Sequence, residues 1–338
     1  MKRKLTLFAV LLITASIFVI PSFAQDDAFV IRAQDLTNPR HIFFDADDNL
    51  YVVEAGHGGT ILVPGFSGNS GVGMNGQVSF IPPRSRPQLL IPGLHSVQSG
   101  ARGPMGIQVT EDTIWLALGE ADTPRLPFTS AVVALDIETY RVKHYIDLYT
   151  PEAELNPDGA IVASNPVDLV LGDDGTLYIA DASANTVWQW TETNGVSVFA
   201  TWDRTDNPVP TAVDISPDGE ITVGFLSGFP FPTEASRIEK WSTEGELIET
   251  IDGMTMVVDI HFASDGTLYA VEYSSGTTSV PANSGRVVVV GEDGLTPIAE
   301  GLHFPYGMGE DSDGNLYVAI NSRAAEGEGQ VLQITGNE

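Results

Sequence analysis

Ionisable residues recur at two equivalent positions of a pattern that repeats along this chain. At the first position, three copies carry an ionisable residue and the three copies between them carry a small one: His41, Asp168 and Asp259, against Gly106, Ala212 and Gly307. At the second position, the same three copies carry an acid: Glu54, Asp181 and Glu272. His261 lies two residues after Asp259 and would share its face of a strand. Carboxylates and imidazoles gathered around one axis could bind a divalent cation or a polar ligand.

Two interpretations of these residues remain open. In the first, they form a polar cluster in a central channel, where neighbouring carboxylates raise one another's pKa as an acid/base pair requires. In the second, each carboxylate accepts hydrogen bonds from backbone amides and connects neighbouring units, so that no metal is needed. We favour the second interpretation for the resting protein, because one carboxylate can accept several such bonds.

The elements that would position these residues come from six copies of a polar Asp/Gly turn followed by an apolar run rich in β-formers. The copies are DADDNLYVVE (45–54), TEDTIWLAL (110–118), GDDGTLYIAD (172–181), SPDGEITVGF (216–225), ASDGTLYAVE (263–272) and DSDGNLYVAI (311–320). Strand-built repeats of roughly 40–50 residues are typical of propeller blades. Each unit then supplies four short antiparallel strands, a to d from the channel outward. The sequence predicts an all-β fold, a six-bladed β-propeller.

The two ends of the chain should meet in one blade. The sixth unit stops at its third strand, QVLQIT (330–335), while AFVIR (28–32) precedes the first unit without a partner. We predict that these segments pair, which closes the ring and makes residues 25–338 a single domain. Residues 1–24 have the basic start, apolar stretch and small terminal residues of a secretory signal peptide, so a secreted or periplasmic protein is expected; an uncleaved anchor is the alternative.

Composition narrows the range of partners. The formal net charge is -29, which disfavours nucleic acids and anionic membranes, since phosphates attract basic surfaces. The chain has no cysteine, which excludes thiolate chemistry and cysteine-based metal sites. We expect a monomer without a membrane span once the signal peptide is removed.

The longest connections are predicted to lie on one rim of the ring. They are the b–c loops 55–75, 119–129, 226–235 and 273–284 and the d–a connections 94–102 and 149–164. Long loops on a rigid scaffold commonly bind ligands. Phe229 and Phe231 could form an apolar platform there, with Glu54, Asp181 and Glu272 near the channel mouth. GVGMNG (71–76) matches a dinucleotide fingerprint, but a strand follows it instead of a helix, so we interpret it as a flexible rim loop.

Several segments resemble the ScyD/ScyE family: NPRHIFF…LYVVEAGHGG (38–59), GARGPMGI (100–107), NPDG (156–159), SNPVDLVL…GTLYIADASAN (164–185), VPTAVDISPDG (209–219) and GFLSGFPFP (224–232). The blades also resemble NHL repeats and gluconolactonase-like propellers. The resemblance implies a secreted or periplasmic β-propeller. Members of the family are associated with gene clusters for scytonemin, an indole-derived ultraviolet-screening pigment, and late steps outside the cytoplasm have been proposed for them.

The resemblance also bears on a metal site. Gluconolactonase-like enzymes place a metal-binding Asn or Asp directly after an inner-strand proline. The corresponding positions here hold Arg40, Met105, Val167, Thr211 and Tyr306, which argues against a lactonase-type metal centre.

Two functions follow from these observations. The leading hypothesis is a binding propeller, with little or no catalysis, that holds a small molecule or a secreted protein at the long-loop mouth of the channel. The alternative is an enzyme that uses the channel carboxylates, either a metal-dependent lactonase-like hydrolase or a late-step pigment oxidoreductase. No catalytic residue and no metal ligand is assigned. The cofactor is left open, with a divalent cation in the channel as one option.

Overall fold

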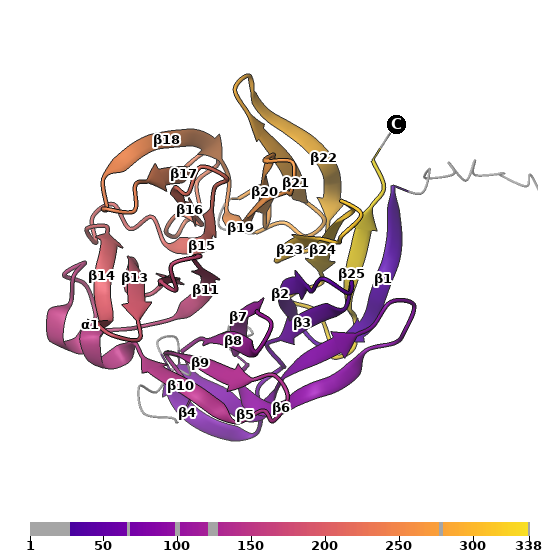
Figure 1. The fold of residues 1–338 in the computed structure, drawn as a ribbon, viewed down its shortest axis with the longest axis horizontal. Coiled ribbons are helices and arrows are strands. Elements are labelled where there is room, and N and C mark those ends of the chain that lie inside the picture. Colours follow the sequence, from indigo (N-terminus) through magenta and orange to yellow (C-terminus); the bar gives the residue numbers. More distant parts are fainter. Residues whose placement is uncertain (1–27, 66–67, 99–101, 121–127, 277–279, 337–338) are drawn as a thin grey trace, which may run out of the picture.

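The computed structural model describes residues 28–65, 68–98, 102–120, 128–276 and 280–336, so the predicted signal peptide lies outside it. Six antiparallel sheets surround a central channel (Figure 1), and five of them have four strands. The innermost, or a, strands are β2 (Pro39–Phe44), β7 (Pro104–Val109), β11 (Pro166–Leu171), β15 (Pro210–Ile215), β19 (Val257–Phe262) and β23 (Met308–Glu310). The prediction of a six-bladed β-propeller is confirmed.

The remaining strands follow the predicted a-to-d order. The b strands are β3 (Leu50–Glu54), β8 (Thr113–Leu118), β12 (Leu177–Asp181), β16 (Ile221–Phe225), β20 (Leu268–Glu272) and β24 (Leu316–Ile320). The c strands are β5 (Gly68–Ile81), β9 (Ala131–Asp136), β13 (Thr186–Thr191), β17 (Ser236–Trp241), β21 (Gly285–Gly291) and β25 (Gly329–Ile334). The d strands are β6 (Gln88–Val97), β10 (Val142–Asp147), β14 (Gly195–Thr201), β18 (Leu247–Met254), β22 (Gly294–Leu302) and β1 (Phe29–Leu36).

The N-terminal strand closes the ring as the sequence predicts. β1 pairs antiparallel with β25, with Phe29 opposite Ile334 and Ile31 opposite Leu332. Figure 1 shows β1, in indigo, beside the yellow β25. The two chain ends therefore share one blade, and no strand edge of β25 is left open.

The apolar core lies between neighbouring sheets. At the closure seam, Leu36 and Val331 from the sixth blade pack with Ile42, Leu50 and Val52 from the first. Further clusters join the first blade to the second and the second to the third. The core is therefore a series of sheet-to-sheet contacts around the ring.

The first long loop of the sequence analysis is in fact mostly strand. β4 (Ile61–Gly65) and the start of β5 form a hairpin within 55–75, and GVGMNG (71–76) lies inside β5. A Cβ added at Gly71 would lie 2.2 Å from the Gly59 carbonyl oxygen, and one at Gly73 would lie 2.4 Å from that of Gly58. These glycines permit close backbone packing, so the interpretation of GVGMNG as a flexible loop was wrong.

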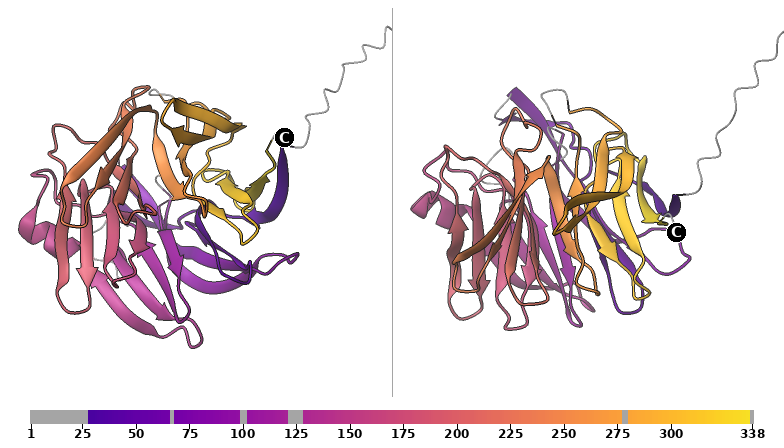
Figure 2. Two further views of the ribbon diagram at one scale, coloured as in Figure 1. Left: turned by 45° about the horizontal axis from the view of Figure 1, so that its top comes forward. Right: turned by 90° about the horizontal axis from the view of Figure 1, so that it is seen from above.

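The d–a connections also contain regular structure. Helix α1 (Tyr149–Leu155) lies within 149–164, at the periphery of the ring in both views of Figure 2. The first part of 94–102 belongs to β6. No described residue belongs to a helix long and apolar enough to cross a membrane.

Two of the other b–c loops share a face where the structure describes them. Loops 226–235 and 273–284 are in contact, because a Cβ at Gly276 would lie 2.9 Å from the Phe231 carbonyl oxygen. Residues 121–127 and 277–279, which belong to the loops 119–129 and 273–284, lie outside the described residues.

We expect removal of Phe29–Leu36 to abolish cooperative unfolding, because it uncovers the edge of β25 and exposes the core around Leu36. Thermal melts followed by circular dichroism and light scattering would show aggregation at lower temperature. A chain that starts at Ala28 keeps β1 and is the control. A truncated protein that melts cooperatively at the temperature of this control would contradict the closure seam.

Candidate functional site

The central channel opens at the face that carries the short a–b turns. The strands β2, β11, β15 and β19 share one pattern, with four buried residues followed by two half-exposed ones. These strands run from the long-loop face toward the turns, so solvent reaches their turn ends. A cavity of about 210 Å³ lies there, and residues of all six innermost strands line it.

Side chains close the opposite end of the channel. Arg40, Met105, Val167 and Tyr306 are buried there. The Arg40 guanidinium lies 4.7 Å from the centre of the Tyr306 ring, and its Nη1 donates to the Ser322 carbonyl oxygen at 2.7 Å. These are the positions where gluconolactonase-like enzymes would carry metal ligands. The structure fills them with packed side chains, so the cavity does not lie at the long-loop mouth.

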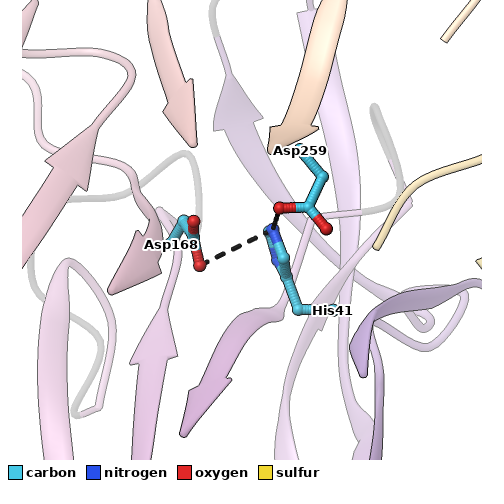
Figure 3. A group of neighbouring side chains, drawn as sticks. All are labelled: His41, Asp168 and Asp259. Atoms are coloured by element: carbon cyan, nitrogen blue, oxygen red, sulfur yellow. Dashed lines mark ion pairs between the residues drawn. The ribbon is translucent and has the colours of Figure 1, made fainter. Parts of the chain in front are cut away.

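Three residues singled out by the sequence meet at the floor of the cavity (Figure 3). The His41 Nε2 lies 3.4 Å from Asp259 Oδ1 and 3.6 Å from Asp168 Oδ1. The His41 Nδ1–H donates to the Met105 carbonyl oxygen at 3.1 Å. His41, Asp168 and Asp259 are at most 6% exposed. These residues, which occupy equivalent inner-strand positions in the sequence, therefore converge at the axis.

The same three residues connect neighbouring blades. Asp168 Oδ2 accepts the Val213 amide at 2.8 Å, and Asp259 Oδ2 accepts the Met308 amide at 2.7 Å. Each carboxylate also accepts the amide of the residue that follows it. Together with the His41–Met105 bond, these contacts join the first blade to the second, the third to the fourth and the fifth to the sixth. This is the arrangement of the second interpretation.

The electrostatics of the cluster favour a protonated histidine. Burial alone would lower the pKa of His41, but the attraction of Asp168 and Asp259 outweighs it and raises the pKa to about 9. Burial raises the pKa of Asp168 to about 7, against the opposing effect of the His41 charge. The imidazolium therefore serves as an internal counterion between two buried carboxylates.

Sequence reasoning missed a second layer of polar residues, two positions further along the inner strands. Gln108 Oε1 accepts the Leu171 amide at 2.6 Å, and Asp214 Oδ2 accepts the Phe262 amide at 2.8 Å. Burial raises the pKa of Asp214 to about 6, against the opposing effect of His261. His261 also lines the cavity. The spacing from Asp259 to His261 was the available signal, and applied to the other blades it finds Gln108 and Asp214.

The three acids at the ends of b strands do not line the cavity. Each accepts a backbone amide from the d–a connection at 2.6 Å: Glu54 from Thr37, Asp181 from Asn165 and Glu272 from Thr255. Glu54 also accepts the Ser79 hydroxyl at 2.5 Å, and Glu272 forms an ion pair with Arg286. Each carboxylate therefore holds a d–a connection against the blade that the connection enters, which is a structural role.

The aromatic pair of the rim is only partly available to a ligand. Phe229 is 72% exposed, whereas Phe231 is half-buried, and their rings meet edge to face at 5.7 Å. Neither residue lines the channel cavity. Their role as a binding platform remains a prediction.

Glu152 on α1 is a buried carboxylate that the sequence did not indicate, because the segment was interpreted as a loop. Its side chain has no exposed surface. Burial raises its pKa to about 7, and the negative charges of Asp181 and Asp158 add to the effect.

The floor cluster has donors that fit a metal ion. One donor atom from each of His41, Asp168 and Asp259 lies within 4.8 Å of the other two. A divalent cation would have to displace the proton on His41 Nε2 and share carboxylate oxygens with backbone amides. The cluster therefore permits a cation in competition with a proton.

Comparison with known proteins supports the fold. No family model and no curated protein matches the chain. A streptogramin B lyase structure is 14% identical with a TM-score of 0.54, over 91% of this chain and 97% of that one. A protein named as a gluconolactonase is 10% identical with a TM-score of 0.54, over 92% and 93%. A protein from Thermus thermophilus named as an oxidoreductase, a glucose dehydrogenase, is 13% identical with a TM-score of 0.58, over 91% and 99%. At these identities the likeness shows a shared propeller fold.

We expect the stability of the wild type to fall as pH rises from 6.5 to 9, by an amount on the order of 3 kcal/mol. The pKa of His41 is raised from 6.5 to about 9 in the folded state, so its contribution is complete below pH 6.5 and is lost as pH passes 9. The double change Asp168→Asn and Asp259→Asn removes the attraction and should flatten this dependence, with a modest loss of stability. Urea denaturation at several pH values measures both effects.

The exposed turn residue Asp218 supplies the control for this experiment. Asp218→Asn should keep the wild-type dependence on pH. Equal slopes for the wild type and the double variant between pH 6.5 and 9 would contradict a charged His41 at the axis.

We expect Glu152→Gln to raise the melting temperature at pH 8. Burial raises the pKa of Glu152 from its ordinary value of 4.5 to about 7 in the folded state. Its ionisation therefore removes stability as pH rises from 4.5 to 7, and the glutamine avoids that loss, roughly 1–3 kcal/mol. At pH 4.5 the gain should vanish. Glu154→Gln, on the exposed side of the same helix, is the control. A loss of stability at pH 8 would mean that the Glu152 carboxylate has a cationic partner.

Proposed function

We propose that this chain is an exported, ScyD/ScyE-like β-propeller that binds a small molecule in the cavity at the short-turn end of its channel. The observation that carries the proposal is the meeting of His41, Asp168, Asp259 and His261 around one cavity. The other residues of the predicted site lie outside this cavity. A secreted protein partner, docked on the long-loop face around Phe229, remains compatible with this proposal because that face is separate.

The lining favours a ligand with positive charge and hydrogen-bond donors. Four carboxylates, those of Asp168, Asp214, Asp259 and Glu310, face two imidazoles across the cavity. A cavity of about 210 Å³ has room for several water molecules. A divalent cation with its waters, or a small organic ammonium, would fit this space and charge. If the ligand is a pigment precursor outside the cytoplasm, it would have to carry a positively charged group such as an ammonium.

A metal-dependent enzyme is the second candidate. The mutual distances of the His41, Asp168 and Asp259 donors favour it, and three fold neighbours are named as a lyase, a gluconolactonase and a glucose dehydrogenase. A bound metal would polarise a substrate carbonyl or a water molecule for hydrolysis. The packed Arg40 and Tyr306 at the long-loop end restrict any substrate to the short-turn side.

We expect Gly309→Leu to abolish ligand binding in the channel while the carboxylates stay in place. Gly309 lines the cavity, and a Cβ there would meet Ile42 Cγ1 at 3.5 Å, an ordinary contact. Titration calorimetry of residues 25–338 with manganese(II) chloride, calcium chloride and methylammonium chloride measures binding. Gly291→Leu, on an exposed strand end, is the control.

Elemental analysis of the purified protein separates the two candidates. A stoichiometric metal that the Asp168→Asn and Asp259→Asn double change removes would favour the enzyme. The absence of binding by all three probes would overturn the channel proposal. Binding that survives Gly309→Leu would place the site elsewhere.

A further inference from the structure

A second and larger cavity lies outside the channel, at the seam between the first and second blades. Its volume is about 520 Å³. We name it the blade 1–2 cavity after its nine lining residues: Phe43, Phe44, Asp45, Ala46, Asp47, Val109, Thr110, Glu111 and Ile137. These residues come from the a–b turns of the two blades, the strand ends beside them and the end of β9. The cavity therefore lies on the same short-turn face as the channel opening.

The two walls of this cavity are held by contacts that do not cross it. On the first blade, Asp48 accepts the Ser312 amide at 2.8 Å and the Ser312 hydroxyl at 3.0 Å, which ties the turn to the sixth blade. On the second blade, Lys143 of β10 pairs with Asp112 at 2.8 Å. Among the described residues, no hydrogen bond crosses from turn 45–49 to turn 110–113. The gap is therefore preformed by anchors on either side.

The chemistry of the lining separates into an apolar wall and an acidic rim. Phe43, Val109 and Ile137 supply the wall, while the Phe44 ring packs against Tyr317 of the sixth blade at 4.6 Å. At the rim, the Asp45 carboxylate accepts hydrogen bonds from its own turn and from the strand that follows. The donors are the Asn49 backbone amide at 2.9 Å, the Asn49 side-chain amide and the Tyr51 hydroxyl.

Two exposed carboxylates on the rim, those of Asp47 and Glu111, are left to meet a ligand. No lining residue is cationic. An anion would therefore meet only repulsion at the rim, whereas an ammonium group would be attracted by both carboxylates.

We propose that the blade 1–2 cavity binds a small apolar cation, with its hydrocarbon or aromatic part against Phe43, Val109 and Ile137 and its ammonium group between Asp47 and Glu111. Neither part suffices alone. Exposed carboxylates give each ion pair little affinity, while the apolar wall contributes through the area that the ligand buries. This site is distinct from the channel site, although Phe43 and Phe44 line both cavities.

Three probes separate charge from apolarity: phenethylammonium carries both features, phenylacetate lacks the positive charge and ethylammonium lacks the apolar part. Ligand-observed NMR titrations of residues 25–338 carrying Gly309→Leu, which fills the channel cavity, should show the tightest binding for phenethylammonium. The double change Asp47→Asn and Glu111→Gln should weaken it about two- to thirtyfold, as expected for two exposed ion pairs. Asp218→Asn, at the matching turn of the fourth blade, should leave it unchanged.

Filling the cavity tests its location. Ala46 is an exposed lining residue, so Ala46→Phe should occupy the space without disturbing the core and should remove phenethylammonium binding. Binding of methylammonium in the channel should persist when Ala46→Phe is made without Gly309→Leu, which distinguishes failure of this site from failure of the proposed function. Ala46→Leu is the alternative if the larger residue lowers the melting temperature.

Four results would overturn the proposal. They are no binding of phenethylammonium, equal binding of phenylacetate, equal binding of ethylammonium, and phenethylammonium binding that survives both Ala46 variants.

Discussion

One imidazolium held between two buried carboxylates organises the centre of this propeller. His41 comes from the first blade, Asp168 from the third and Asp259 from the fifth, and each passes a hydrogen bond to the next blade. A buried ion is costly unless it is paired, and removal of one partner leaves the others uncompensated. All six inner strands are therefore fixed relative to one polar point, which gives the channel a rigid floor.

That floor divides the channel into two unequal halves. On one side, Arg40 and Tyr306 pack into a closed plug. On the other, the strand ends separate and leave a polar cavity whose carboxylates outnumber its imidazoles. The His41 charge repels an incoming cation, while Asp214 and Glu310, nearer the turns, attract one. Because these acids are closer to the opening than the floor, attraction prevails where a ligand would enter.

The repeated features of the fold could be predicted from the sequence. Features that depend on contacts between distant segments could not. The Asp/Gly turns are local signals, so the six blades and the closure by β1 could be predicted. The sequence placed His41, Asp168 and Asp259 at equivalent inner-strand positions around one axis, but whether their side chains meet stayed open, because that depends on packing between blades. The open end could not be predicted, since it depends on Arg40 packing against Tyr306, 266 residues further along the chain. Loop 55–75 was misjudged because its glycines allow close strand packing as well as flexibility.

Rigidity suits the short-turn face, where both described cavities lie, to binding a small ligand. A small ligand gains affinity when the groups that contact it are already in place, because less conformational freedom is lost on binding. Carboxylates within the short turns hold these turns in place. In the sixth blade, for example, the Asp311 carboxylate accepts hydrogen bonds from the Asn315 amide and the Tyr317 hydroxyl. The strands beside them are fixed by the floor cluster. Residues such as His261 and Phe43 are thus held in position before any ligand arrives, whereas Phe229 on the rim, 72% exposed, would have to be ordered by its partner.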